Sequence, residues 1–125
     1  MNENELSKII VDCCFKIHSK LGPGLLESVY EEVLAYELRK NGLSFTRQET
    51  VPVVYDEIKL DIGFRADIIV EDRVIIEIKS VETIMPAHYK QVVTYLRLTG
   101  IKLGLLVNFN SALIKDGIKR VVKDL

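Results

Sequence analysis

The sequence predicts an α/β or α+β fold in which helices flank a mixed central β-sheet. Three observations support this prediction. The expected elements follow in the order helix, helix, strands with a hairpin, helix, strand and strand. Residues 103–109 are apolar apart from Asn108, as in a strand covered on both faces. Within residues 63–80, β-branched residues alternate on both sides of a short polar segment, which is typical of a hairpin.

The length and composition are those of a globular chain. We expect a single domain over residues 1–125, and the hydrophobic fraction of 48% is large enough to fill its core. The formal net charge of -1 excludes a general electrostatic attraction to nucleic acid, so phosphate binding would need a local patch, a metal ion or an assembled surface. The first residues are acidic, and no apolar run approaches the roughly 20 residues of a spanning helix. We therefore expect a soluble, cytoplasmic protein.

Apolar residues at three- and four-residue steps predict two helices in the first third of the chain. The first covers residues 5–21 and ends at Gly22-Pro23-Gly24, because glycine forms the cap and proline cannot continue the ladder. The second covers about residues 25–40. Its predicted apolar stripe consists of Leu26, Val29, Tyr30, Val33, Leu34 and Leu38.

Glu27 is out of place on this second helix. It lies about 100° around the helix from Leu26, inside the apolar stripe, so its carboxylate is expected to face the body of the protein. No basic residue of the same helix lies three or four positions away, and a buried charge needs a partner. That partner would come from elsewhere in the fold or be a metal ion. The alternative is an acid of the first helical turn, stabilised by the helix dipole.

The predicted hairpin brings two acids opposite each other. A three-residue turn at Glu71-Asp72-Arg73 pairs Val70 with Val74. Three residues further from the turn on each strand, Asp67 then lies opposite Glu77. The opposite face of the hairpin is predicted to be apolar and consists of Ala66, Ile68, Val70, Val74, Ile76 and Ile78.

The charge pattern of the hairpin predicts a cation site. Opposed carboxylates roughly 5 Å apart repel by about 3 kcal/mol at an effective dielectric near 20. Lys79 lies on the same face as Glu77 and would offset part of this repulsion. Mg²⁺ or Mn²⁺, which prefer hard oxygen ligands, would offset it better. The alternative is a solvated face with an ordinary cross-strand Glu and Lys.

The strands before the hairpin and the segments after it complete the predicted sheet. Residues 45–54 form a strand whose Pro52 indicates an edge position or a bulge. Residues 58–62 form a short strand or the lead-in to the hairpin. The tail of residues 112–122 adds a strand or a hairpin around Asp116-Gly117. Its basic residues, Lys115, Lys119, Arg120 and Lys123, either protect an exposed edge or contact DNA.

A third helix is predicted between the hairpin and the apolar strand, with Pro86 in its first turn and Gly100 past its end. A row with a histidine, an amide and a phenol is able to orient water or phosphate, although such rows also occur on solvated faces. This helix has such a row at positions i, i+3 and i+7, made of His88, Gln91 and Tyr95. Its buried stripe is expected to consist of Tyr89, Val92, Val93 and Leu96.

The segment Gly24-Leu-Leu-Glu27-Ser-Val-Tyr30 has the spelling G-x-x-E-x-x-Y and resembles the bacterial and archaeal GxxExxY protein family. That family is grouped with the PD-(D/E)XK, restriction-endonuclease-like nucleases, so the resemblance implies a restriction-endonuclease-like core. It extends from about Leu6 to Val122, although Ala66-Asp67 replaces the literal Pro-Asp of the motif. The other matching segments are Leu21-Gly-Pro-Gly, Phe64-Arg-Ala-Asp67, Glu77-Ile-Lys79, His88 with Gln91, Tyr95-Leu96 and Leu106-Val-Asn-Phe109.

The resemblance implies a metal-dependent nuclease that hydrolyses phosphodiester bonds, with DNA as the expected substrate. Mg²⁺ or Mn²⁺ would be held by Asp67, Glu77 and the backbone carbonyl of Ile78, with Glu27 binding directly or through water. The catalytic residues would be Lys79, which orients or deprotonates the attacking water, Gln91, which positions the attack, and Glu27. The candidates for phosphate or substrate contact are His88, Tyr95, Arg65, Lys119 and Arg120.

Two other functions remain open at this point. One is a non-catalytic nucleic-acid-binding or protein-interaction module that retains the nuclease fold. The other is a small-molecule or nucleotide phosphohydrolase, although the sequence has no Gly-rich phosphate loop of the form G-x-x-x-x-G-K-[ST]. A nuclease of this size would need to form a homodimer to cut both strands of a duplex.

Overall fold

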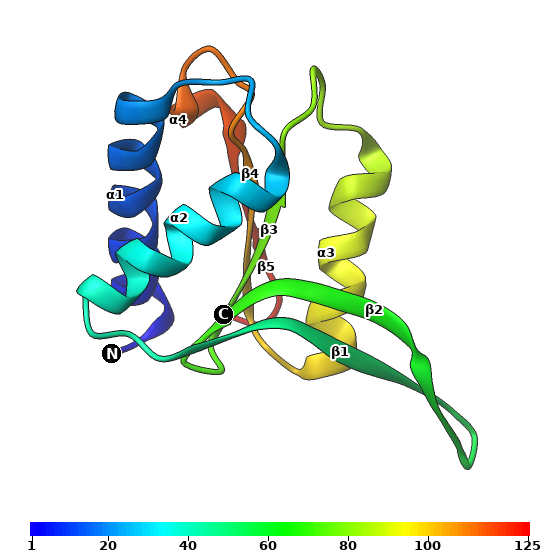
Figure 1. The fold of residues 1–125 in the computed structure, drawn as a ribbon. Coiled ribbons are helices and arrows are strands. Elements are labelled where there is room, and N and C mark those ends of the chain that lie inside the picture. Colours follow the sequence, from blue (N-terminus) through cyan, green and yellow to red (C-terminus); the bar gives the residue numbers. More distant parts are fainter.

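The computed structural model describes residues 1–125, with the exception of the side chain of Ile62. A five-stranded sheet lies between two layers of helices (Figure 1). The elements in chain order are α1 (Glu3–Leu21), α2 (Glu27–Lys40), β1 (Phe45–Tyr55), β2 (Ile58–Val70), β3 (Val74–Lys79), α3 (Pro86–Thr99), β4 (Leu103–Asn108), α4 (Ile114–Gly117) and β5 (Ile118–Val122).

The sheet is mixed, as predicted. Its strand order is β1-β2-β3-β4-β5. Strands β3 and β4 are parallel, and the other neighbouring pairs are antiparallel. Helices α1 and α2 cover one face and α3 covers the other (Figure 1). These features confirm the α/β (α+β) class and are consistent with a restriction-endonuclease-like core.

Two apolar clusters fill the space between the layers. The larger lies between α1, α2 and the sheet, and it includes Ile68, Ile76 and Ile78. The smaller lies between the sheet and α3, and it includes Ile69 and Ile75. Since β3 and β4 contribute to both sides, nearly every residue of these strands is buried. The largely apolar segment of residues 103–109 therefore contains a strand covered on both faces, as expected.

The hairpin of β2 and β3 has the predicted register, with Val70 opposite Val74. Residues 58–62 are its lead-in, because β2 continues without a break from Ile58. One alternative and one expectation about its faces are wrong. The side that carries Glu77 is not solvated, because α3 packs over it. Ala66 packs in the cluster on the α3 side rather than with Ile68, and it pairs with Glu49 of β1.

Strand β1 is an edge strand with a register shift between Val51 and Val53, on either side of Pro52. Both structural readings of this proline are therefore confirmed. Beyond the shift, β1 and β2 form a two-stranded ribbon that extends past the rest of the molecule (Figure 1). Tyr55 and Ile58 are exposed near its tip.

The first two helices begin in different ways. Asn2 and Glu5 form a reciprocal capping box at the start of α1, with the Asn2 side chain 2.8 Å from Glu5 N. Helix α2 begins two residues later than predicted, because Leu26 has extended backbone angles and a 71% exposed side chain. None of the described helices is long and apolar enough to cross a membrane.

The tail differs in part from the prediction. Its strand is present as β5, but the segment around Asp116-Gly117 forms the single helical turn α4 instead of a hairpin. Gly117 is tightly enclosed there, since a Cβ atom at this position would lie 2.4 Å from the Asn108 carbonyl oxygen and 2.5 Å from Ser111 Oγ. The turn therefore packs against the end of β4 only with glycine at this position.

We expect Gly117→Ala to lower the free energy of unfolding by about 1–3 kcal/mol, because the added methyl group has no room against backbone atoms. Chemical denaturation of the two proteins measures this change. Lys115→Ala is the matched control in the same turn, since Lys115 is exposed and its loss should change stability by less than about 0.5 kcal/mol. Equal stability of Gly117→Ala and wild type would contradict the prediction.

Candidate functional site

The ladder between β2 and β3 ends where Asp67 and Glu77 lie opposite each other. Backbone pairing extends to Ile68 and Ile76. At the next position side chains replace it: Asp67 N donates to Glu77 Oε1 over 3.1 Å, and Ile78 N donates to Asp67 Oδ2 over 2.8 Å. Each acid thus satisfies a backbone N–H of the other strand. The predicted proximity of the two carboxylates is confirmed.

Burial makes this pair of acids electrostatically costly. Glu77 is 2% exposed, and burial together with the nearby Asp67 carboxylate raises its pKa to about 8. Burial also raises the pKa of Asp67. Lys79 Nζ lies 4.0 Å from Glu77 Oε2, on the predicted face, and lowers the pKa of Glu77 only in part. One ammonium group therefore does not fully compensate the two carboxylates.

Glu27 does not lie inside an apolar stripe. It is exposed in the first turn of α2, where the helix begins. The helical wheel predicted a buried position because it counted Leu26 as part of the helix. Its Oε2 accepts a hydrogen bond from Ser80 N over 3.2 Å. Glu27 is thus a first-turn acid, as in the alternative reading, and it lies beside the end of β3.

Tyr30 explains the second half of the G-x-x-E-x-x-Y spelling. Its hydroxyl donates to the Gly22 carbonyl oxygen over 2.6 Å and accepts from Leu25 N over 3.2 Å. Its buried ring stacks on Phe109, with 4.4 Å between the ring centroids. Tyr30 therefore anchors the loop that leads into Glu27.

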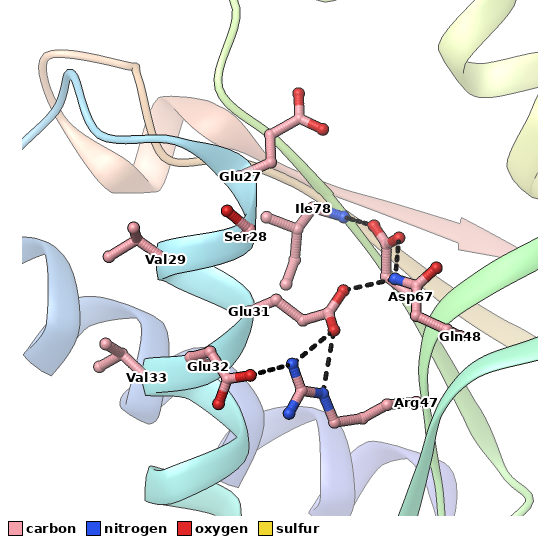
Figure 2. Close-up of a pocket in the computed structure, with 10 residues that line it drawn as sticks. All are labelled: Glu27, Ser28, Val29, Glu31, Glu32, Val33, Arg47, Gln48, Asp67 and Ile78. Atoms are coloured by element: carbon pink, nitrogen blue, oxygen red, sulfur yellow. Dashed lines mark hydrogen bonds and ion pairs between the residues drawn. The ribbon is translucent and has the colours of Figure 1, made fainter.

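Glu31 is the acid that the sequence analysis missed. It is 7% exposed, and its Oε2 accepts from Arg47 Nε over 2.9 Å while its Oε1 accepts from Gln48 Nε2 over 2.6 Å. The same Gln48 nitrogen donates to Asp67 Oδ1 over 3.2 Å (Figure 2). A partial signal was available, since Glu31 lies about 20° beyond Leu38 on the helical wheel, at the edge of the predicted apolar stripe.

These side chains line a cleft of about 710 Å³ between α2 and the sheet (Figure 2). Glu27, Glu31 and Glu32 come from α2, and Asp67 comes from β2. Arg47 is the cation in the lining, and it is paired with Glu31 and with Glu32, each within 3 Å. The lining is therefore acidic, and it would attract a metal cation rather than a bare phosphate group.

The predicted polar row of α3 faces the sheet. Tyr95 is 1% exposed, its hydroxyl donates to the Arg65 carbonyl oxygen over 2.9 Å, and it accepts from Gln91 Nε2 over 3.1 Å. Burial and the Glu77 carboxylate raise the pKa of Tyr95, so it remains a neutral phenol. His88 Nδ1 accepts from Met85 N over 2.9 Å at the start of α3.

The expected apolar stripe of α3 is correct only in part. Val92 and Leu96 are buried as predicted, whereas Tyr89 and Val93 are exposed at 36% and 46%. Tyr95 takes the place of these two residues in the buried face. The helix is rotated relative to the prediction because the aromatic ring of Tyr95 fills the space against β2, in edge contact with Phe64.

The two basic candidates of β5 point away from each other. Lys119 pairs with Leu106, which pairs with Glu77, so two strand spacings separate Lys119 from Glu77 and three separate it from Asp67. Adjacent strand residues face opposite sides of a sheet, and Arg120 accordingly donates to Asn4 at the start of α1. Neither residue is brought directly to the carboxylate pair.

The donor set fits a divalent cation of the Mg²⁺ type. No group of three or more His, Cys, Asp and Glu side chains close enough to hold a metal occurs among the described residues. The site instead offers two carboxylates, Asp67 and Glu77, whose shared negative charge lacks a full partner. Mg²⁺ commonly binds through one or two carboxylates and keeps several waters. The chemistry of the two acids therefore suits it.

In metal-free protein the stability should fall as the pH rises. The folded state holds the Glu77 proton up to a pKa of about 8, whereas the unfolded chain releases it near 4.5, so the folded state binds more protons between these values. Glu77→Gln removes this penalty and should be about 1–3 kcal/mol more stable than wild type at pH 8. Thermal unfolding in chelator at about pH 5 and about pH 8 measures the difference. A difference in stability between the two proteins that does not increase from about pH 5 to about pH 8 would contradict this account.

Comparison with known proteins supports the nuclease fold. The family model of the PD-(D/E)XK nuclease superfamily matches residues 4–121. Searches of curated proteins and of solved structures give no match. The family match spans nearly the whole chain, including the two hairpin acids, Lys79 and Gln91. The chain belongs to the PD-(D/E)XK nuclease superfamily.

Proposed function

We propose that the protein is a metal-dependent nuclease that hydrolyses phosphodiester bonds, with DNA as its substrate. The observation that carries this proposal is the pair of carboxylates, Asp67 and Glu77, at the point where β2 and β3 stop pairing. The ammonium group of Lys79 lies 4.0 Å from Glu77. Asp67 borders the cleft, and the superfamily acts on nucleic acids. The G-x-x-E-x-x-Y spelling further supports membership of the GxxExxY family.

Asp67, Glu77 and the carbonyl group of Ile78 would hold Mg²⁺ or Mn²⁺. Glu27 would add a contact through water, because it is exposed and its carboxylate is tethered to Ser80 N at the end of β3. The bound ion would supply a Lewis acid for the scissile phosphate and lower the pKa of a water molecule.

The other residues of the site would move or orient protons. Lys79 would orient or deprotonate the attacking water and stabilise the negative charge that develops on the phosphate. Gln91 would position the attacking water. Its amide is held by a hydrogen bond to the Tyr95 hydroxyl on the half-buried face of α3. Arg65 and Lys119 are the better candidates for phosphate contact, because the other three, His88, Tyr95 and Arg120, make hydrogen bonds within the protein.

We expect Lys79→Ala to lower Mn²⁺-dependent cleavage of plasmid DNA by at least about 100-fold, because the proton-transfer group of the site is lost. Thermal unfolding should show that the variant folds. Lys59→Ala is the matched control, since Lys59 is exposed on the β1–β2 ribbon and its removal should leave cleavage unchanged. Undiminished cleavage by Lys79→Ala would reject the assignment.

A non-catalytic nucleic-acid-binding or protein-interaction module is the second candidate. The observation that favours it is the presence of two clustered carboxylates rather than three among the described residues. A module of this kind has no need to bind a metal ion, so metal binding distinguishes the two functions.

Calorimetric titration with Mn²⁺ should show one site in wild type, and Asp67→Ala should weaken its Kd by at least about 10-fold. The physical reason is the loss of a carboxylate ligand that β3 and β1 hold in place. Asp61→Ala is the control, because this acid is exposed on the same strand, nearer the ribbon tip. No heat of binding in wild type, or equal affinity in Asp67→Ala, would favour the module.

A further inference from the structure

We propose that Gln48 of β1 is a positioning residue for the metal-binding carboxylates. This inference rests on the proposed function, and it extends the site to β1, to which no role has been assigned above. One amide nitrogen of Gln48 donates to Asp67 Oδ1 over 3.2 Å and to Glu31 Oε1 over 2.6 Å (Figure 2). Both hydrogens of this nitrogen are therefore directed at acids, one on β2 and one on α2.

The two oxygens of Asp67 are held from opposite sides. Ile78 N of β3 donates to Oδ2 over 2.8 Å, and Gln48 of β1 donates to Oδ1. A carboxylate with one donor rotates about its Cα–Cβ and Cβ–Cγ bonds, whereas two donors from different strands define its plane. A ligand already ordered in the metal-free protein loses less conformational freedom when the cation binds, so the affinity rises.

The backbone of Gln48 is unusual in a way that directs its side chain. Its φ is 54°, in the left-handed region that non-glycine residues rarely adopt. Other non-glycine residues with positive φ in the described chain lie in hairpin turns or near the C-terminus, whereas Gln48 lies inside a strand. Such a conformation persists where the surroundings fix it, and it occurs often at functional sites.

The chemistry of the side chain suits this position. Arg47, the preceding residue, pairs with Glu31 and Glu32 and neutralises charge on the α2 side of the cleft. An amide instead fixes Asp67 with a hydrogen bond and leaves its negative charge available to a cation. A lysine or arginine at position 48 would place a positive charge where the metal ion is expected.

The test uses Gln48→Gly, which removes the amide but accepts the positive φ without strain. We expect its Tm to equal or exceed that of wild type, while its Kd for Mn²⁺ in calorimetry weakens by about 10–100-fold. A purely structural role would predict a lower Tm and an unchanged Kd. Asp56→Gly is the matched control, since Asp56 has a φ of 53° in the turn of the β1–β2 ribbon. It should keep the wild-type Kd.

A second variant keeps the test possible if Gln48→Gly does not fold. Gln48→Asn keeps an amide and tolerates the left-handed conformation, but it is one methylene shorter and cannot reach both carboxylates, so the same loss of affinity is expected. A wild-type Kd in whichever of the two variants folds would overturn this inference and leave the proposed function intact. Failure of the wild-type protein itself to bind Mn²⁺ would overturn both.

Discussion

The reciprocal hydrogen bonds of Asp67 and Glu77 determine where the sheet opens. Strands β2 and β3 pair through their backbones up to Ile68 and Ile76, and beyond this point each acid accepts the N–H group of the opposite strand. A buried backbone donor needs an acceptor, so the two carboxylates have a structural role in addition to any chemical one. This arrangement places two acids beside each other in a buried position, where Glu77 keeps its proton up to a pKa of about 8. A cation bound there would replace that proton.

The other elements serve this opening in different ways. Helix α3 buries Glu77 and supplies Gln91, which is bound to Tyr95 on its sheet-facing side. On the other face, Tyr30 fixes the loop before α2 and thereby places Glu27 near the end of β3. Strand β1 contributes through Gln48. Helix α2 and strands β1 and β2 thus contribute polar groups to the cleft beside Asp67, and α3 covers the side of the sheet that carries Glu77.

The residues that the sequence predicts well are those whose positions follow from strand geometry. Asp67, Glu77 and Lys79 were predicted because side chains alternate strictly along a strand and the turn defines the register. Helical positions were predicted less well. A shift of two residues in the start of α2 exposed Glu27, and the buried acid is Glu31. On α3, Tyr89 and Val93 were predicted to be buried, whereas Tyr95 is the buried residue.

The order of elements, the apolar core strands and the charged side of the hairpin were determined by the sequence alone, because they depend on local periodicity. Contacts between distant segments were decided only by the tertiary structure. The sequence gives no indication that Gln48 bridges Glu31 and Asp67, since these residues come from three elements and meet only when α2 packs on the sheet. The cleft exists for the same reason: its walls are far apart in the chain and are joined by packing.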